Sequence, residues 1–204
     1  MTAWLNTFYT VALVIALSFA SLASAVKMDE TTHDQVIHRL ELGLDSLDKK
    51  DPVRAGLLLR LADLYADRAR LKGMNEVAEN CQKCTGSRDD RKRALGLYNE
   101  ALPLSAKADQ GRIILQIAHI HTLNDQSSKS TELYKKILSS SRNMYSSEVR
   151  GVANSSLGEI EFRRGNFTQA LKYYESARKE NIKNRALVEY RIAWCHLNLG
   201  RNDQ

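Results

Sequence analysis

Apolar residues recur every three or four positions through most of the chain, which is the spacing of helices that bury one face. The clearest example spans residues 157–177, where two such runs flank the turn Gly165-Asn166. Small residues such as Gly158 and Ala170 stand where the two helices would touch, and aromatic residues nearby would fill the remaining space. This stretch predicts a pair of antiparallel helices joined by a tight turn.

The order of these residues resembles the tetratricopeptide repeat (TPR), a helical hairpin that occurs in tandem arrays. Leu157-Gly158 stands in the first helix, and Phe162 precedes the turn. The match departs at Asn154 and Glu161, where the repeat usually carries aromatic residues. The second helix supplies the aromatic and small positions of the repeat at Phe167, Ala170, Tyr174 and Ala177. The resemblance implies a scaffold for protein interactions.

Weaker copies of this hairpin pattern lie on both sides of it, as expected of a stacked array. We therefore expect an all-α chain: a right-handed α-solenoid of antiparallel, TPR-like helix pairs, with about three and a half repeats and a leading helix. The expected parts are a leading amphipathic helix at residues 26–51, a split unit at 52–110, a degenerate unit at 111–150, the clear unit at 151–185 and the first helix of an incomplete unit at 186–204.

Two parts of the expected array are irregular. The split unit carries an insertion at residues 71–90, so either both of its helices are extended or a long excursion joins them. The incomplete unit would leave Ile192, Trp194 and Leu197 without the second helix that covers such residues elsewhere. We expect a further helix or another subunit to cover this face, and self-association through this last helix is one such arrangement.

The N-terminus differs from the rest of the chain. No charged side chain precedes Lys27, residues 11–19 are apolar, and Ala23-Ser24-Ala25 fits a small-x-small cleavage site. Residues 1–25 therefore predict a secretory signal peptide that is cut after Ala25, which would export the chain, most simply to a bacterial periplasm, with no membrane span left after cleavage. Because no Lys or Arg precedes the apolar run, an uncleaved N-terminal anchor is the alternative.

The net charge of +6 comes from 30 Lys and Arg against 24 Asp and Glu. A basic balance can indicate nucleic-acid binding, but export argues against that partner, and charges of both signs alternate along the predicted helices. Attraction to an anionic envelope polymer is a further alternative, and it would weaken as salt rises.

Cys81 and Cys84 form a Cys-x-x-Cys pair within the insertion. Such a pair can be a local disulfide, two free thiols, or a redox or metal site. No His follows Cys84, no second Cys-x-x-Cys exists, and Cys195 lies far away in sequence. A disulfide is favoured in an oxidising compartment, and the other two interpretations stay open.

No other motif indicates chemistry. The chain has no P-loop, H-E-x-x-H, G-x-S-x-G or G-x-G-x-x-G, which are the patterns of common phosphate, metal and nucleophile sites. His119 and His121 are two residues apart on one predicted helix, so they point to different faces. We expect no catalytic residue, cofactor or metal.

The TPR resemblance also implies where a partner would bind, because first helices line the concave surface of such arrays. Transferred position by position, this predicts a partner-binding face formed by Leu59, Asp63, Arg112, His119, Glu159, Phe162, Arg163, Tyr190 and Trp194. The function that the sequence favours is a non-enzymatic TPR scaffold that holds a protein or peptide partner in a cell-envelope or periplasmic assembly. The alternative is a redox or metal-binding module centred on Cys81 and Cys84.

Overall fold

The computed structural model describes residues 29–200, and within that range every regular element is helical. An amphipathic pattern with few prolines permits this outcome throughout. The α-helices are α2 (Glu30–Asp45), α3 (Arg54–Ala78), α4 (Gly86–Ala101), α5 (Lys107–Leu123), α6 (Ser127–Ser139), α7 (Ser147–Arg163), α8 (Phe167–Arg178) and α9 (Arg185–Asn198), with a short 3-10 turn, η1 (Leu102–Leu104), after α4.

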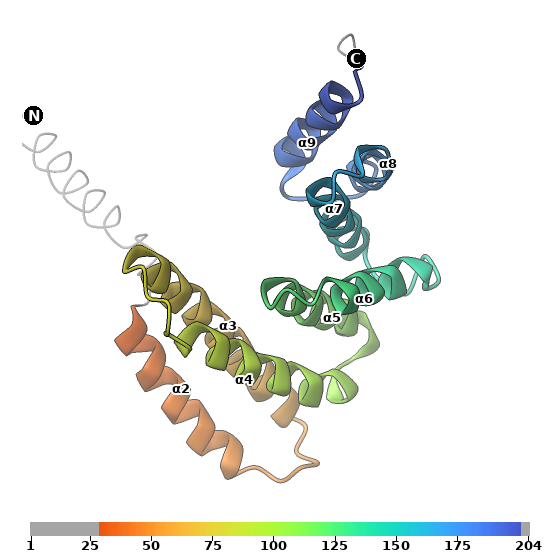
Figure 1. Ribbon diagram of the computed structural model, residues 1–204. Coiled ribbons are helices and arrows are strands. Elements are labelled where there is room, and N and C mark those ends of the chain that lie inside the picture. Colours follow the sequence, from red (N-terminus) through yellow and green to blue (C-terminus); the bar gives the residue numbers. More distant parts are fainter. Residues whose placement is uncertain (1–28, 201–204) are drawn as a thin grey trace, which may run out of the picture.

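The helices are arranged as antiparallel pairs that follow one another along the array. Figure 1 shows α3 with α4, α5 with α6, and α7 with α8, while α2 lies beside α3 at one end and α9 follows α8 at the other. Each helix packs mainly on its neighbours in sequence, and α5 also contacts α7. Contacts that are confined to adjacent units are the defining property of a solenoid.

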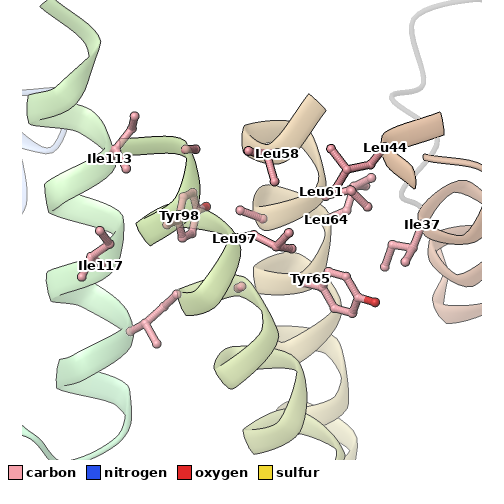
Figure 2. Packing of buried hydrophobic residues seen from close by; sticks show 14 residues of the cluster. Ile37, Leu44, Leu58, Leu61, Leu64, Tyr65, Leu97, Tyr98, Ile113 and Ile117 are labelled. Carbon is pink, nitrogen blue, oxygen red and sulfur yellow. The ribbon is translucent and has the colours of Figure 1, made fainter. Parts of the chain in front are cut away.

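The buried residues form three clusters along the array. The first joins α2, α3, α4 and α5, and Figure 2 shows Leu58, Leu61 and Tyr98 at its centre with Ile37 reaching in from α2. The second lies between the α5/α6 and α7/α8 pairs. The third joins α8 to α9 through side chains that include the buried Cys195. Each part of the array within residues 29–200 therefore has a buried cluster of its own.

Glycines allow the closest approaches between helices. A Cβ atom on Gly158 would lie 2.7 Å from the ring of Tyr174, so the hairpin at residues 157–177 packs at the small position that its sequence pattern indicates. A Cβ atom on Gly111 would lie 2.6 Å from the ring of Tyr145, a buried residue of the α6–α7 loop. The long loop between these helices therefore packs against α5.

The insertion lengthens both helices of the split unit. α3 continues to Ala78 and α4 begins at Gly86, so only residues 79–85 form the connection. The carboxylate of Glu76 accepts a hydrogen bond from the backbone N–H of Ser87 at 2.9 Å, in the first turn of α4. Because this N–H has no partner within its own helix, Glu76 stabilises the start of α4. The long excursion that the sequence also allowed is not formed.

The signal peptide that we expect at residues 1–25 lies outside the described residues. None of the helices within residues 29–200 has the length and apolar character needed to cross a membrane.

Candidate functional site: a groove along the first helices

The first hollow on the face formed by the first helices lies between α3 and α5. It encloses about 360 Å³ and brings together Leu59, Asp63 and Arg112, three of the predicted partner-binding residues. Tyr98 of α4 also lines this hollow and donates a hydrogen bond from its hydroxyl to Oδ1 of Asp63 at 2.6 Å. Desolvation by burial, together with the Asp63 carboxylate, raises the pKa of Tyr98. The tyrosine is therefore a neutral donor that orients Asp63.

A second hollow of about 490 Å³ lies between α5 and α7. Arg112 and His119 line it from α5, and Val152 lines it from α7. Desolvation lowers the pKa of His119, so its imidazole is neutral at pH 7 and can both donate and accept a hydrogen bond. At the rim, Lys183 and Glu148 form an ion pair at 3.1 Å.

A third hollow, of about 700 Å³, lies between the extended end of α3 and α5. Its walls are mainly apolar, and they include Met74 and Val77 from the insertion and Leu123 from α5. These three side chains are 56%, 82% and 51% exposed, respectively. Exposed apolar side chains gathered in one hollow indicate an interaction surface.

The three hollows share one wall, the exposed face of α5. Arg112 lines the first and second hollows, His119 lines the second and third, and Gln116 lines all three. These residues are four and three positions apart, so they lie on one face of the helix. Among the described residues Arg112 forms no ion pair. We call the three hollows together the α5 groove.

Glu159, Phe162 and Arg163 of the predicted face lie on α7, outside the α5 groove. Arg191 of α9 binds the Glu159 carboxylate through Nε at 2.7 Å and Nη2 at 3.1 Å, and its guanidinium lies 4.9 Å from the centre of the Phe162 ring. Tyr174 donates a hydrogen bond to Glu159 at 2.8 Å. Glu159 and Phe162 therefore connect helices, while Arg163 is exposed at the end of α7.

Tyr190 and Trp194 are exposed together on α9. Their rings meet edge to face with centroids 6.1 Å apart. Leu187 and Leu197 on the same helix are also about half exposed. The structure thus separates the predicted partner-binding residues into the α5 groove, the Arg191-linked residues of α7 and an exposed patch on α9.

The cysteines of the insertion lie apart from these surfaces. Cys81 and Cys84 are joined by a disulfide in the α3–α4 connection, and Cys195 is buried with a free thiol. Within residues 29–200 no group of three or more His, Cys, Asp or Glu side chains is placed to hold a metal ion.

Gln116 and the apolar wall of the third hollow were not predicted from the sequence as site residues. A signal for the wall exists, because Ala66, Ala69, Gly73 and Val77 recur at spacings of three and four from the residues before the insertion into its first part. That stripe could have identified a second buried or binding face on α3. Gln116 has no comparable signal, since its importance comes from its place between three hollows.

The helix pairs and the groove along their first helices define a TPR-like α-solenoid, so the fold class predicted from the sequence is confirmed. The crystal structure of MamA is similar to this chain with a TM-score of 0.58 and 14% identity over 87% of this chain and 89% of MamA. The apo form of the quorum sensor NprR from B. thuringiensis is similar with a TM-score of 0.50 and 18% identity over 96% of this chain. The chain covers 59% of NprR. No protein-family model matches the sequence, and no curated protein matches it.

Proposed function

We propose that this chain is a non-enzymatic scaffold that holds a protein partner along its concave face, with the α5 groove as the main binding surface. The observation that carries the proposal is the continuity of the groove, because Arg112, Gln116 and His119 link three hollows across one helix. A TPR-like fold supports an interaction role, and neither similar structure favours the redox or metal-binding alternative at Cys81 and Cys84.

The chemistry of the groove suits a polypeptide segment. The apolar wall of the third hollow can take side chains of the partner, while the Gln116 amide and the neutral His119 imidazole can donate to and accept from backbone groups. Arg112 supplies a positive charge at the boundary of two hollows. Apolar anchors with polar groups at their edge are the usual composition of a protein interface.

The test is affinity capture from a cell-envelope extract with three forms of the chain. Arg112→Glu reverses a charge within the groove, and Lys135→Glu makes the same change of charge on α6, outside the three hollows. We expect the natural chain and Lys135→Glu to capture the same proteins, and Arg112→Glu to lose them. Capture of no protein, or equal capture by all three forms, would contradict the proposal.

A double change on α9, Tyr190→Ala with Trp194→Ala, locates the partner further along the array. Loss of the same captured proteins would show that the partner reaches from the α5 groove to α9. Capture that persists would restrict the partner to the groove. Aromatic side chains of this kind are frequent anchors in protein interfaces.

We also propose that the chain acts after export, in a periplasmic or other cell-envelope assembly. The support is the apolar run at residues 11–19 followed by Ala23-Ser24-Ala25, which is the pattern of a cleaved signal. Mass spectrometry of the protein from a bacterial periplasmic fraction should find a mature chain that begins at Val26. An intact N-terminus in the membrane fraction would support the anchor alternative, and a chain retained in the cytoplasm would contradict export.

A further inference from the structure

The third hollow of the α5 groove exists because the insertion lengthens α3. Its α3 wall runs from Ala66 to Ala78 with small side chains at Ala69 and Gly73 and larger ones at Met74 and Val77. Twelve residues of helix rise span about 18 Å, or about three turns. The facing wall on α5 contributes residues between Gln116 and Leu123 at spacings of three and four. The hollow thus runs along α3 beside α5, and Met74 and Val77 present exposed apolar side chains to it.

The other side of α3 shows what this helix binds within its own chain. There α2 packs through Ile37 and Leu44, both of which are buried in the first core cluster. α2 is an acidic amphipathic helix, with four carboxylates and one arginine in sixteen residues. Its apolar stripe and its carboxylates both contact the α3/α4 pair.

Cations on α3 and α4 hold the carboxylates that border the stripe of α2. Arg68 of α3 forms an ion pair with Asp34. Lys72 of α3 lies 3.7 Å from Glu30, and Arg93 of α4 lies 3.3 Å from Glu41. α3 and α4 therefore recognise an acidic amphipathic helix through an apolar stripe that is flanked by basic side chains. Three ion pairs carry this pattern around α2, two of them from α3 and one from α4.

The third hollow presents the same combination without an occupant from the described chain. Its apolar stripe is bordered by Arg70 of α3 and Arg91 of α4, and Asp67 is the one carboxylate among its lining residues. Arg70 forms no ion pair among residues 29–200. A partner helix with apolar residues at i, i+3, i+4 and i+7 and with flanking carboxylates would complement both the shape and the charge.

We propose that the third hollow is a docking channel for an acidic amphipathic helix of a protein partner. This inference rests on the proposed scaffold function and names the chemistry of the partner for one part of the α5 groove. About three turns of partner helix fit along the α3 wall. Met74, Val77 and Leu123 contact its apolar stripe, and Arg70 and Arg91 pair with its carboxylates.

A labelled synthetic peptide with the α2 sequence, residues 29–46, is a defined probe of this chemistry. Its binding to the full chain is measured by fluorescence anisotropy. Val77→Glu places a carboxylate in the channel at a side chain that is 82% exposed, and Val53→Glu makes the same change at a side chain that is 63% exposed before the start of α3. We expect Val77→Glu to weaken binding by about ten-fold or more, as loss of an interface anchor does, and Val53→Glu to leave it unchanged.

Charge variants test the second part of the proposal. Arg70→Glu should weaken binding several-fold, whereas Lys135→Glu should not. A peptide in which Asp34, Glu41 and Asp45 are replaced by Asn, Gln and Asn should bind more weakly than the acidic peptide, and the difference should shrink as salt rises. Circular dichroism of each protein variant verifies that its helix content is retained.

Two results would overturn the docking channel. One is a peptide that does not bind, or that binds Val77→Glu and Val53→Glu equally. The other is a peptide that exchanges with α2, in which case Arg93→Glu weakens binding and Val77→Glu does not. If the peptide does not bind the channel but Arg112→Glu still loses the captured envelope proteins, the docking channel alone is rejected. If the peptide binds the channel but the natural chain captures no envelope protein, the scaffold proposal is rejected.

Discussion

At the scale of single residues, two tyrosines perform the same task in different units. Tyr98 of α4 donates its hydroxyl to Asp63 of α3, and Tyr174 of α8 donates its hydroxyl to Glu159 of α7. The acceptors occupy equivalent positions, one residue after Leu61-Ala62 and Leu157-Gly158. The TPR resemblance placed both carboxylates on the partner-binding face. Their hydrogen bonds show that they also join the two helices of a unit.

The raised pKa values of these two tyrosines predict that the folded chain loses stability at alkaline pH. Burial first, and then the neighbouring carboxylate, raises the pKa of Tyr98 and of Tyr174. The folded chain therefore holds these protons more tightly than the unfolded chain, whose tyrosines have a pKa of about 10. This contribution to stability is complete below that pH and is lost as pH rises above it.

Urea unfolding between pH 7 and pH 11 measures this effect. Tyr174→Phe should lower the free energy of unfolding by about 1 kcal/mol at neutral pH, because one hydrogen bond is lost, and should make the fall above pH 10 shallower. Tyr173→Phe, at a half-buried neighbour, is the matched control. An equally steep alkaline fall in the Tyr174→Phe chain would contradict this role.

Glycine substitutions provide a second prediction at the residue scale. Gly158→Ala would bring a Cβ atom to 2.7 Å from the Tyr174 ring, whereas Gly96→Ala on α4 would meet no atom within 4 Å. We expect the first to destabilise the chain by about 1–3 kcal/mol through overpacking. The second should stabilise it by about 0.5–1 kcal/mol, since alanine favours helix over glycine. Thermal melts of both variants measure these changes in stability. A Gly158→Ala chain as stable as the natural chain would show that α7 and α8 can move apart without loss of stability.

At the scale of elements, α3 is the helix on which the N-terminal part of the structure depends. Its side chain Arg68 is mostly buried and connects α2 to α4 through Asp34 and Asp90, and Lys72 also pairs with Asp90 at 3.1 Å. These pairs, with the apolar contacts of Ile37 and Leu44, fasten α2 along α3. The extension of the same helix forms the wall of the third hollow.

Removal of Arg68 should release α2 more than the rest of the chain. Arg68→Ala leaves the buried Asp90 with Lys72 alone and should destabilise the chain by about 3 kcal/mol, as loss of one partner from a buried ion pair does. Hydrogen exchange should accelerate most in residues 30–45. Arg60→Ala, at an exposed position of the same helix, should leave exchange unchanged. Uniform acceleration over all helices would show that α2 is not a separate unit of stability.

At the scale of the whole molecule, α9 differs from the three helix pairs before it, because no described residue covers one of its sides. In the clear unit Tyr174 covers Gly158, but Ala193, which stands in the place of Gly158, is exposed in the described chain. Leu187, Tyr190, Trp194 and Leu197 add exposed apolar surface on the same helix. Exposed apolar patches of this kind mark interaction sites.

We predict that the chain self-associates through α9. Analytical ultracentrifugation should show a dimer that dissociates as concentration falls, and Leu197→Lys should shift it to monomer. Leu42→Lys, at another exposed leucine on α2, should not. A natural chain that sediments as a monomer at about 100 μM, where specific micromolar dimers form, would contradict this interface.

Sequence by itself determined the helix pairs, because a spacing of three and four and the matched small and aromatic positions act within one hairpin. Gly158 with Tyr174 is the clearest case: the local pattern predicted a close approach, and the Tyr174 ring fills the space that a side chain on Gly158 would need. Only the tertiary structure decided what lies between units. The sequence of the insertion was compatible with extended helices or with an excursion, and the structure has extended helices. Glu159 is bound by Arg191 from another unit. The α5 groove depends on how α3, α5 and α7 stack. Periodicity records which face of a helix is buried, but it does not record the angle or partner of packing between distant helices.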